Sequence, residues 1–147
     1  MSIFTQQSIR LGVPARDQRQ FLQAVAELGA EQGILEDVPG VVAAMLDREK
    51  QSTTALMDGV AIPHAKHEAI RRPGVLVLRS AAPVEWTAGE SVGVGVALLV
   101  PGAEAGTTHL QILSRVARAL MNKGLRETLN GGTEAEIHEA LGARLDA

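Results

Sequence analysis

Two long aliphatic runs in the middle of the chain constrain its fold more than any other feature. Residues 74–79 read Gly-Val-Leu-Val-Leu-Arg, and residues 92–100 read Val-Gly-Val-Gly-Val-Ala-Leu-Leu-Val. Turn-forming residues flank both runs, so we expect two strands. Because successive residues are apolar, both faces of each strand must be buried, and this pattern is typical of a sheet that helices cover on both sides.

Segments with apolar residues at helical spacing precede these runs. Residues 15–32 predict an amphipathic helix that stops near Gly33. Residues 38–49 predict a second helix, with Asp37 as its N-cap and Pro39 in its first turn. The polar residues that follow predict a turn that leads into a short strand.

The C-terminal third predicts two further helices. The last covers residues 133–145, and the one before it has an apolar face formed by Leu110, Leu113, Val116, Ala117, Leu120 and Met121. A chain of 147 residues has the length of one domain with a proper core. We therefore expect a single α/β domain over residues 1–147, with helices on both faces of a central sheet.

Composition and charge exclude several classes of function. The net charge of −3 and the lack of a basic stripe argue against nucleic acid as a partner. The chain has no cysteine, which rules out disulfides and thiol chemistry. The N-terminus lacks the pattern of a signal peptide, and residues 92–100, the longest apolar run, are far fewer than the ~20 needed to span a bilayer. We expect a soluble, cytoplasmic protein without membrane insertion.

A histidine at the end of an apolar segment is the first candidate for chemistry. Residues 59–63 read Gly-Val-Ala-Ile-Pro and run directly into His64. Pro63 fixes its own φ and biases Ile62 toward extended geometry, so the segment predicts a strand that ends in a loop with the imidazole at the stop. Such a histidine has little conformational freedom, which suits a group that must meet a partner's reactive atom.

Three other histidines are present, and two of them favour ordinary roles. His138 lies among glutamates in the predicted last helix and is interpreted as a surface residue. His67 follows His64 by three residues, which raises the possibility of a metal pair. Pro63 makes this segment a poor helix, however, and neither cysteines nor a dense carboxylate set supply further ligands, so we expect no metal site.

His109 has a stronger case for function. Thr108 and Gln111 fit a capping box, which places His109 in the first turn of a helix. Free N–H groups and the positive end of the helix dipole favour an anion there. The spacing alone supports an exposed first-turn residue equally well.

Four ordered blocks of this sequence resemble the type-2 enzyme IIA domains of the bacterial phosphoenolpyruvate-dependent sugar phosphotransferase system, the fructose, mannitol and nitrogen-regulatory branch. The blocks are Arg48-Glu49 with Ser52-Thr53-Thr54, the Ala-Ile-Pro-His segment that ends at His64, the apolar strand over residues 96–101, and the segment over residues 109–114. Together they cover roughly residues 5 to 145. The resemblance implies that the central sheet is mixed.

The resemblance also implies roles for four residues. His64 would be the tele-phosphohistidine intermediate, and His109 would support the transfer. Arg48 would present several N–H donors to phosphoryl oxygens, although it could be a solvated cation at a helix end. Thr54 would donate its hydroxyl to the phosphoryl group or the imidazole, although it could simply satisfy a turn. Glu49 and Lys66 are interpreted as structural or interface residues.

The implied function is a phosphotransferase that works without a metal or cofactor. The phosphocarrier protein HPr would load His64, and a IIB component of a sugar permease would unload it for sugar uptake. Two alternatives remain open: a nitrogen-regulatory phosphoprotein that binds targets in a phosphorylation-dependent way, and an unrelated function such as a metal-dependent hydrolase. The family's glycines around Ser-Thr are replaced by Ser52, Ala55 and Met57, which predicts a stiffer loop before His64.

Overall fold

The computed structural model describes residues 3–103 and 106–145. Along the chain its elements are η1 (Gln6–Ser8), β1 (Ile9–Val13), α1 (Gln18–Glu31), α2 (Val38–Gln51), β2 (Val60–Ala61), β3 (His64–His67), β4 (Gly74–Glu85), β5 (Ser91–Pro101), α3 (Gly106–Ala119), α4 (Lys123–Gly131) and α5 (Glu134–Leu145). No helix within the described ranges combines the length and the apolar character that crossing a membrane requires.

The five strands form one mixed sheet, as the family resemblance implies. The strand order is β1-β4-β5-β2, and β3 also pairs with β5. β4 and β5 are antiparallel, whereas β1 is parallel to β4, and β2 and β3 are parallel to β5. β2 and β3 therefore follow one another along the same side of β5 and form an edge of the sheet.

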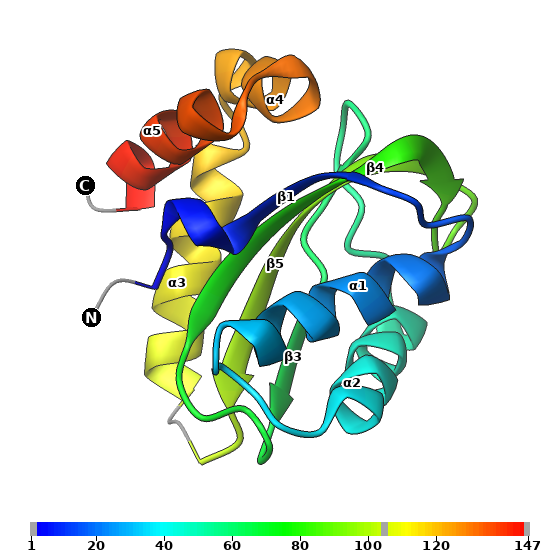
Figure 1. The fold of residues 1–147 in the computed structure, drawn as a ribbon, viewed down its shortest axis with the longest axis vertical. Helices are drawn as coiled ribbons and strands as arrows, with labels where there is room; N and C mark the ends of the chain where they lie inside the picture. Colours follow the sequence, from blue (N-terminus) through cyan, green and yellow to red (C-terminus); the bar gives the residue numbers. More distant parts are fainter. Residues whose placement is uncertain (1–2, 104–105, 146–147) are drawn as a thin grey trace.

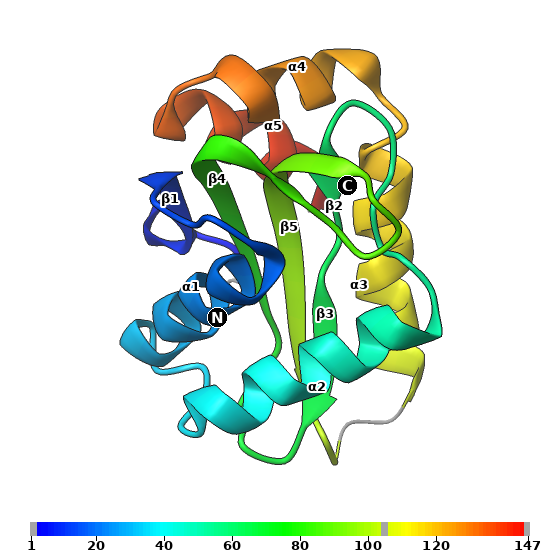
Figure 2. The ribbon, with the colours of Figure 1, turned by 90° about the vertical axis from the view of Figure 1, so that its right-hand side faces the viewer.

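Helices cover both faces of this sheet, which confirms the expected α/β architecture (Figure 1). Helices α1 and α2 lie on one face, and α3, α4 and α5 lie on the other, as the perpendicular view in Figure 2 also shows. The sheet side chains alternate between two separate cores: Leu76 and Leu78 of β4 join the first, and Val75 and Val77 join the second. This double burial explains the continuous aliphatic runs.

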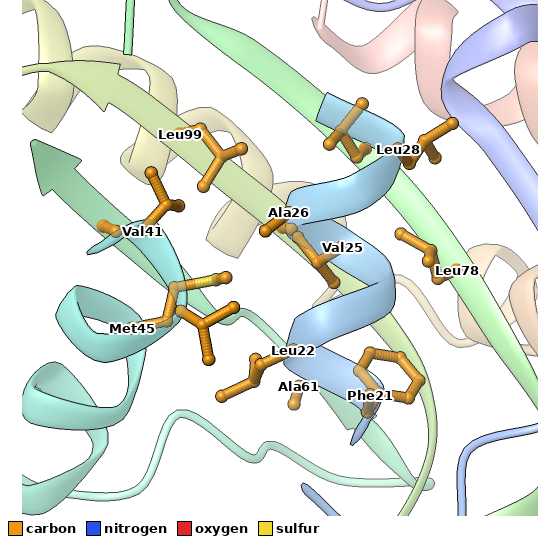
Figure 3. Packing of buried hydrophobic residues seen from close by; sticks show 14 of the residues in the cluster. Phe21, Leu22, Val25, Ala26, Leu28, Val41, Met45, Ala61, Leu78 and Leu99 are labelled. Carbon is orange, nitrogen blue, oxygen red and sulfur yellow. The ribbon is translucent and has the colours of Figure 1, made fainter. Parts of the chain in front are cut away.

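The first core lies between the sheet and α1 and α2. Figure 3 shows Phe21, Leu22 and Val25 of α1 packed toward the sheet, with Met45 of α2 beside them. All four are fully buried. The aliphatic composition is thus sufficient for a closed core.

The two N-terminal helices begin and end as their local signals predict. Asp17 and Asp37 are the N-caps, and their carboxylates accept hydrogen bonds from the N–H groups of Gln20 and Gly40. Helix α1 ends before Gly33, whose φ of +73° suits glycine. Because Asp17 caps α1, the helix starts at Gln18 rather than at the predicted residue 15.

Among the elements that the sequence prediction missed are β1 and α4. β1 is short and contains Gly12, so it lacks a clear strand pattern, and α4 is rich in polar residues with glycine near each end. The strand expected at residues 74–79 also continues to Glu85, past an irregularity in its pairing with β5.

The predicted apolar face of α3 was partly wrong. Leu110 and Met121 are 65% and 66% exposed. Val116 and Leu120 of the predicted face are buried as expected, and so is Ile112, which the prediction left out. Met121 lies two residues beyond Ala119, the last residue of α3, so the helical periodicity no longer directs it toward the core.

Candidate phosphoryl-transfer site

His64 lies on the edge strand rather than in a loop. It opens β3, where it pairs with Leu98 of β5, and it is 7% exposed. The prediction of a strand that stops at the histidine was therefore wrong. Pro63 has no N–H and interrupts the edge locally, but its carbonyl accepts from the N–H of Leu98 at 2.9 Å, so pairing resumes at once.

Hydrogen bonds to both ring nitrogens define the state of the His64 imidazole. Nδ1 lies 2.8 Å from the carbonyl oxygen of Ile62, and because a carbonyl only accepts, Nδ1 carries the proton. Nε2 accepts a hydrogen bond from Nε of Arg48 at 3.0 Å. The ring is therefore a neutral imidazole with its lone pair on Nε2.

The surroundings of His64 favour that neutral form. Burial of the ring is the largest effect and lowers its pKa below 6.5, while the Ile62 carbonyl opposes this shift. Arg48 and His109 lower the pKa further, and Glu49 raises it. The net result is an unprotonated imidazole at neutral pH.

His109 lies next to His64, although the two residues are 45 positions apart in the sequence. The ring centroids are 5.8 Å apart and the rings are nearly perpendicular, at 88°. Burial lowers the pKa of the half-buried His109, and the positive charge of Lys66 adds to this. His109 is thus a neutral imidazole beside His64.

Helix α3 begins earlier than the capping pattern predicts. Its first residue is Gly106, so Thr108 is the third helical residue and not the N-cap. The side chain of Thr108 lies outside the described part of the structure. His109 nevertheless remains in the first turn of α3, as predicted.

Arg48 reaches the site from the last turn of α2. Besides its bond to His64, it donates from Nη1 to the carbonyl of Ser52 at 2.9 Å, with the Ser52 hydroxyl at 3.5 Å. The guanidinium is therefore oriented by the residue that ends its own helix. The family resemblance placed Arg48 in the site without indicating that it would bond to Nε2 of His64.

Thr54 is buried behind the site, and its hydroxyl donates to Glu49. The N–H of Thr54 also donates to Glu49, at 3.1 Å, and its carbonyl accepts from the N–H of Ile62 at 3.0 Å. In this structure Thr54 thus connects Glu49 to the residue that holds Nδ1 of His64. A hydrogen bond from Thr54 to a phosphoryl group remains a prediction.

His67 and His138 lie elsewhere. Side chains alternate along β3, so His67 is on the opposite face from His64. There it lies near the start of α2, where a Cβ at Gly40 would be 3.2 Å from its Cε1, and its Nδ1 accepts from the N–H of Ala69. His138 packs on Phe4, with centroids 5.5 Å apart. Within residues 3–103 and 106–145, no three His, Cys, Asp or Glu side chains are grouped as metal ligands.

Comparison with known proteins bears on the family and the fold of this chain. Residues 2–143 match the sequence model of the family described as "Phosphoenolpyruvate-dependent sugar phosphotransferase system, EIIA 2". The chain is 34% identical over 123 residues to the PTS system fructose-specific EIIA component of Haloferax volcanii, covering 82% of this chain and 79% of that protein. It is 33% identical over 146 residues to the nitrogen regulatory protein of Klebsiella oxytoca, covering 95% and 88%. It spans only 22% of the fructose-specific EIIABC component of Bacillus subtilis.

Two solved structures show the same fold over nearly the whole chain. The nitrogen regulatory protein IIA-Ntr of Neisseria meningitidis superposes with a TM-score of 0.83 at 27% identity, covering 95% of this chain and 96% of that one. Enzyme IIA of the mannitol system of Escherichia coli, in complex with phosphorylated enzyme IIB, gives a TM-score of 0.77 at 25% identity, with 95% and 97% covered. The chain therefore belongs to the type-2 EIIA family of the phosphoenolpyruvate-dependent sugar phosphotransferase system.

Proposed function

We propose that Nε2 of His64 accepts a phosphoryl group from the phosphocarrier protein HPr, or a nitrogen-branch homologue, and passes it to a IIB component of a sugar permease. The observation that carries this proposal is the tautomer of His64. The Ile62 carbonyl holds the proton on Nδ1, which leaves the lone pair on Nε2 for attack on phosphorus.

The step needs no proton transfer at His64. The Nε2 lone pair forms the new N–P bond while the N–P bond of the donor phosphohistidine breaks, and its electron pair returns to the donor ring. The Nδ1 proton stays on the bond to Ile62 throughout. Phosphoryl transfer depends mainly on in-line positioning and on stabilisation of charge, and both are within the capacity of protein groups alone.

Two side chains would stabilise that charge. Nε of Arg48 is 3.0 Å from the nitrogen that becomes bonded to phosphorus, so the guanidinium must shift by a short distance and can then donate to phosphoryl oxygens. The neutral His109 ring is close enough to donate an N–H to the same group. Thr54 would join them only if its hydroxyl turned away from Glu49.

The mannitol IIA relative, which was solved in complex with phosphorylated IIB, supports a IIB component as the acceptor. By analogy, this chain would dock to its partner through the surface around His64. We place the exchange in the cytoplasm, where the IIB acceptor would be reached.

A nitrogen-regulatory role is the second candidate, and a specific observation favours it. The match to the nitrogen regulatory protein of Klebsiella oxytoca covers 95% of this chain, more than the 82% covered by the fructose-specific component. In that role the same phosphohistidine would control binding to target proteins. Neighbouring genes for IIB and IIC components would favour transport, whereas a neighbourhood related to sigma-54 would favour regulation.

Labelling with radioactive phosphoenolpyruvate tests the proposal. Incubation with enzyme I and HPr should give an acid-labile, base-stable adduct on the wild-type protein and none on His64→Ala. His67→Ala is the matched control and should be labelled normally, because its ring lies on the opposite face of β3. Labelling that survives in His64→Ala would overturn the assignment.

A further inference from the structure

Glu49 is a buried carboxylate that the proposed mechanism does not use. It lies in the last turn of α2, next to Arg48, and is 3% exposed. Glutamate is rarely buried to this extent unless it is paired, because loss of hydration penalises the charge. Its presence at this position therefore calls for a function.

Hydrogen bonds, and not a cation, compensate the carboxylate. Oε1 accepts from the N–H of Thr54 and from the hydroxyl of Thr87, and Oε2 accepts from the hydroxyl of Thr54. Thr87 is itself held by Nε2 of Gln18 at 2.7 Å. Among the described residues, no Lys or Arg forms an ion pair with Glu49. Three donors match an ionised carboxylate, which only accepts, so the site holds a negative charge that no cation neutralises.

This negative charge is linked to the His64 imidazole on two sides. On one side, Arg48 directly precedes Glu49 in the chain and donates to Nε2 of His64. On the other, Thr54 connects Glu49 to Ile62, whose carbonyl holds Nδ1. The field of Glu49 reaches the ring, because it is one of the charges that shift the pKa of His64, and it acts in the upward direction.

We propose that the buried charge of Glu49 destabilises the phosphorylated state of His64 and so keeps the phosphoryl group transferable. Phosphorylation replaces a neutral ring by a group with up to two negative charges, which the Glu49 carboxylate repels across a low-dielectric interior. Arg48 and His109 stabilise the same group, and Glu49 opposes them. The bonds made and broken are those of the proposed transfer, and Glu49 takes part in none of them. This inference rests on the proposed function.

The exchange equilibrium with HPr tests the charge separately from the shape. Glu49→Gln keeps the size of the side chain, and the threonine hydroxyls can rotate to meet its amide. We expect the equilibrium between phosphorylated HPr and this protein to shift about three- to tenfold toward the phosphorylated form of this protein, with slower discharge to IIB. Thr87→Val, which removes one donor and leaves the charge, should keep the wild-type equilibrium. Glu49→Gln/Thr87→Val gives the same neutral site with one donor fewer and should reproduce the shift of the single variant.

The pKa of His64, followed by NMR in the unphosphorylated protein, gives an independent reading of the same charge. It should fall in Glu49→Gln, because a negative neighbour that favours the imidazolium is lost. An unchanged exchange equilibrium in folded Glu49→Gln, or a shift toward phosphorylated HPr, would overturn the inference. Failure of the wild-type protein to load at all would instead reject the proposed function.

Discussion

The imidazole rings of His64 and His109 are perpendicular to each other, with their centroids 5.8 Å apart. One ring comes from the edge strand of the sheet and the other from the first turn of α3. Because the Nδ1 proton of His64 is bonded to Ile62, the two histidines are not equivalent. In the proposed transfer, His64 would attack through its Nε2 lone pair and His109 would donate to the group that is transferred.

His109→Ala should still become labelled but should pass its phosphoryl group to IIB more slowly, by about tenfold to a hundredfold. Loss of a donor to developing charge costs about a hundredfold or more in a closed site, and the half-buried position of His109 lowers that effect. Rapid-quench measurement of discharge would give the rate. His109→Gln, which retains an N–H donor, is the control and should recover part of it. Equal discharge rates for His109→Ala and the wild type would contradict the proposed role.

Arg48→Met should slow phosphoryl transfer through His64, because the site loses its planar set of donors. Arg48→Lys keeps the charge but not the planar set of N–H donors, so we expect an intermediate rate of transfer. The pKa of His64 should rise in Arg48→Met, since the Arg48 charge lowers it. NMR titration of the ring would measure the shift. Lys50→Met, an exposed cation in the same helical turn, is the matched control and should change neither quantity.

The rate of phosphorylation should stay nearly constant from pH 8 to pH 6.5. At lower pH it should fall as one proton binds to the His64 ring. Burial, the main cause, lowers the pKa of His64 from 6.5, so Nε2 keeps its lone pair until the pH drops below that value. The same lowered pKa makes the free energy of unfolding depend on pH. The contribution of His64 is fully present above pH 6.5, where the ring is neutral in both the folded and the unfolded chain. It decreases as the pH falls toward the lowered pKa of the folded state, because the unfolded chain then binds more protons. Loading rates and urea denaturation across this range would check both effects. A loading rate that already halves near pH 7 would contradict the first.

Arg126→Ala should lower the free energy of unfolding by about 1–3 kcal/mol. The buried guanidinium of Arg126 donates to Asp58 at 2.8 Å and to the carbonyl of Leu120 at 2.8 Å, and the Asp58 side chain is 53% exposed, which moderates the loss. Urea denaturation would measure the change. Arg118→Ala is the matched control on α3, where the arginine is exposed, and should cost less than about 0.5 kcal/mol. Similar losses in the two variants would refute the role of the Arg126 contacts.

The parts of the fold that could be predicted from the sequence are those whose signals are local. The N-caps of α1 and α2 lie within three residues of the groups that they bind, and the runs in β4 and β5 are long enough to be recognised as buried strands. Helix α4 has one such signal, the Asn122 side chain that accepts from the N–H of Leu125 at 2.8 Å, but its nine residues are mostly polar and form no apolar run. Its place depends on tertiary contacts: Arg126 and Asn130 bond to Asp58, which is some seventy residues earlier and has a φ of +60°.

The candidate site follows the same division. His64 bonds to Ile62, which is only two residues away in the sequence. The family resemblance placed Arg48 and His109 near His64. The burial of Glu49 could not be predicted, because one of its donors is Thr87 at the turn between β4 and β5.

The two cores on opposite faces of the sheet have a consequence for the way variants will divide. Arg48 is carried by α2, which packs in the first core, and His109 by α3, which packs in the second, and both side chains contact His64 of β3. A packing defect under α2 would therefore displace the guanidinium and leave the second imidazole in register, whereas a defect under α3 would do the reverse. Mutations in the interior would thus fall into two classes. One class would misalign Arg48 with His64, and the other would misalign His109 with His64.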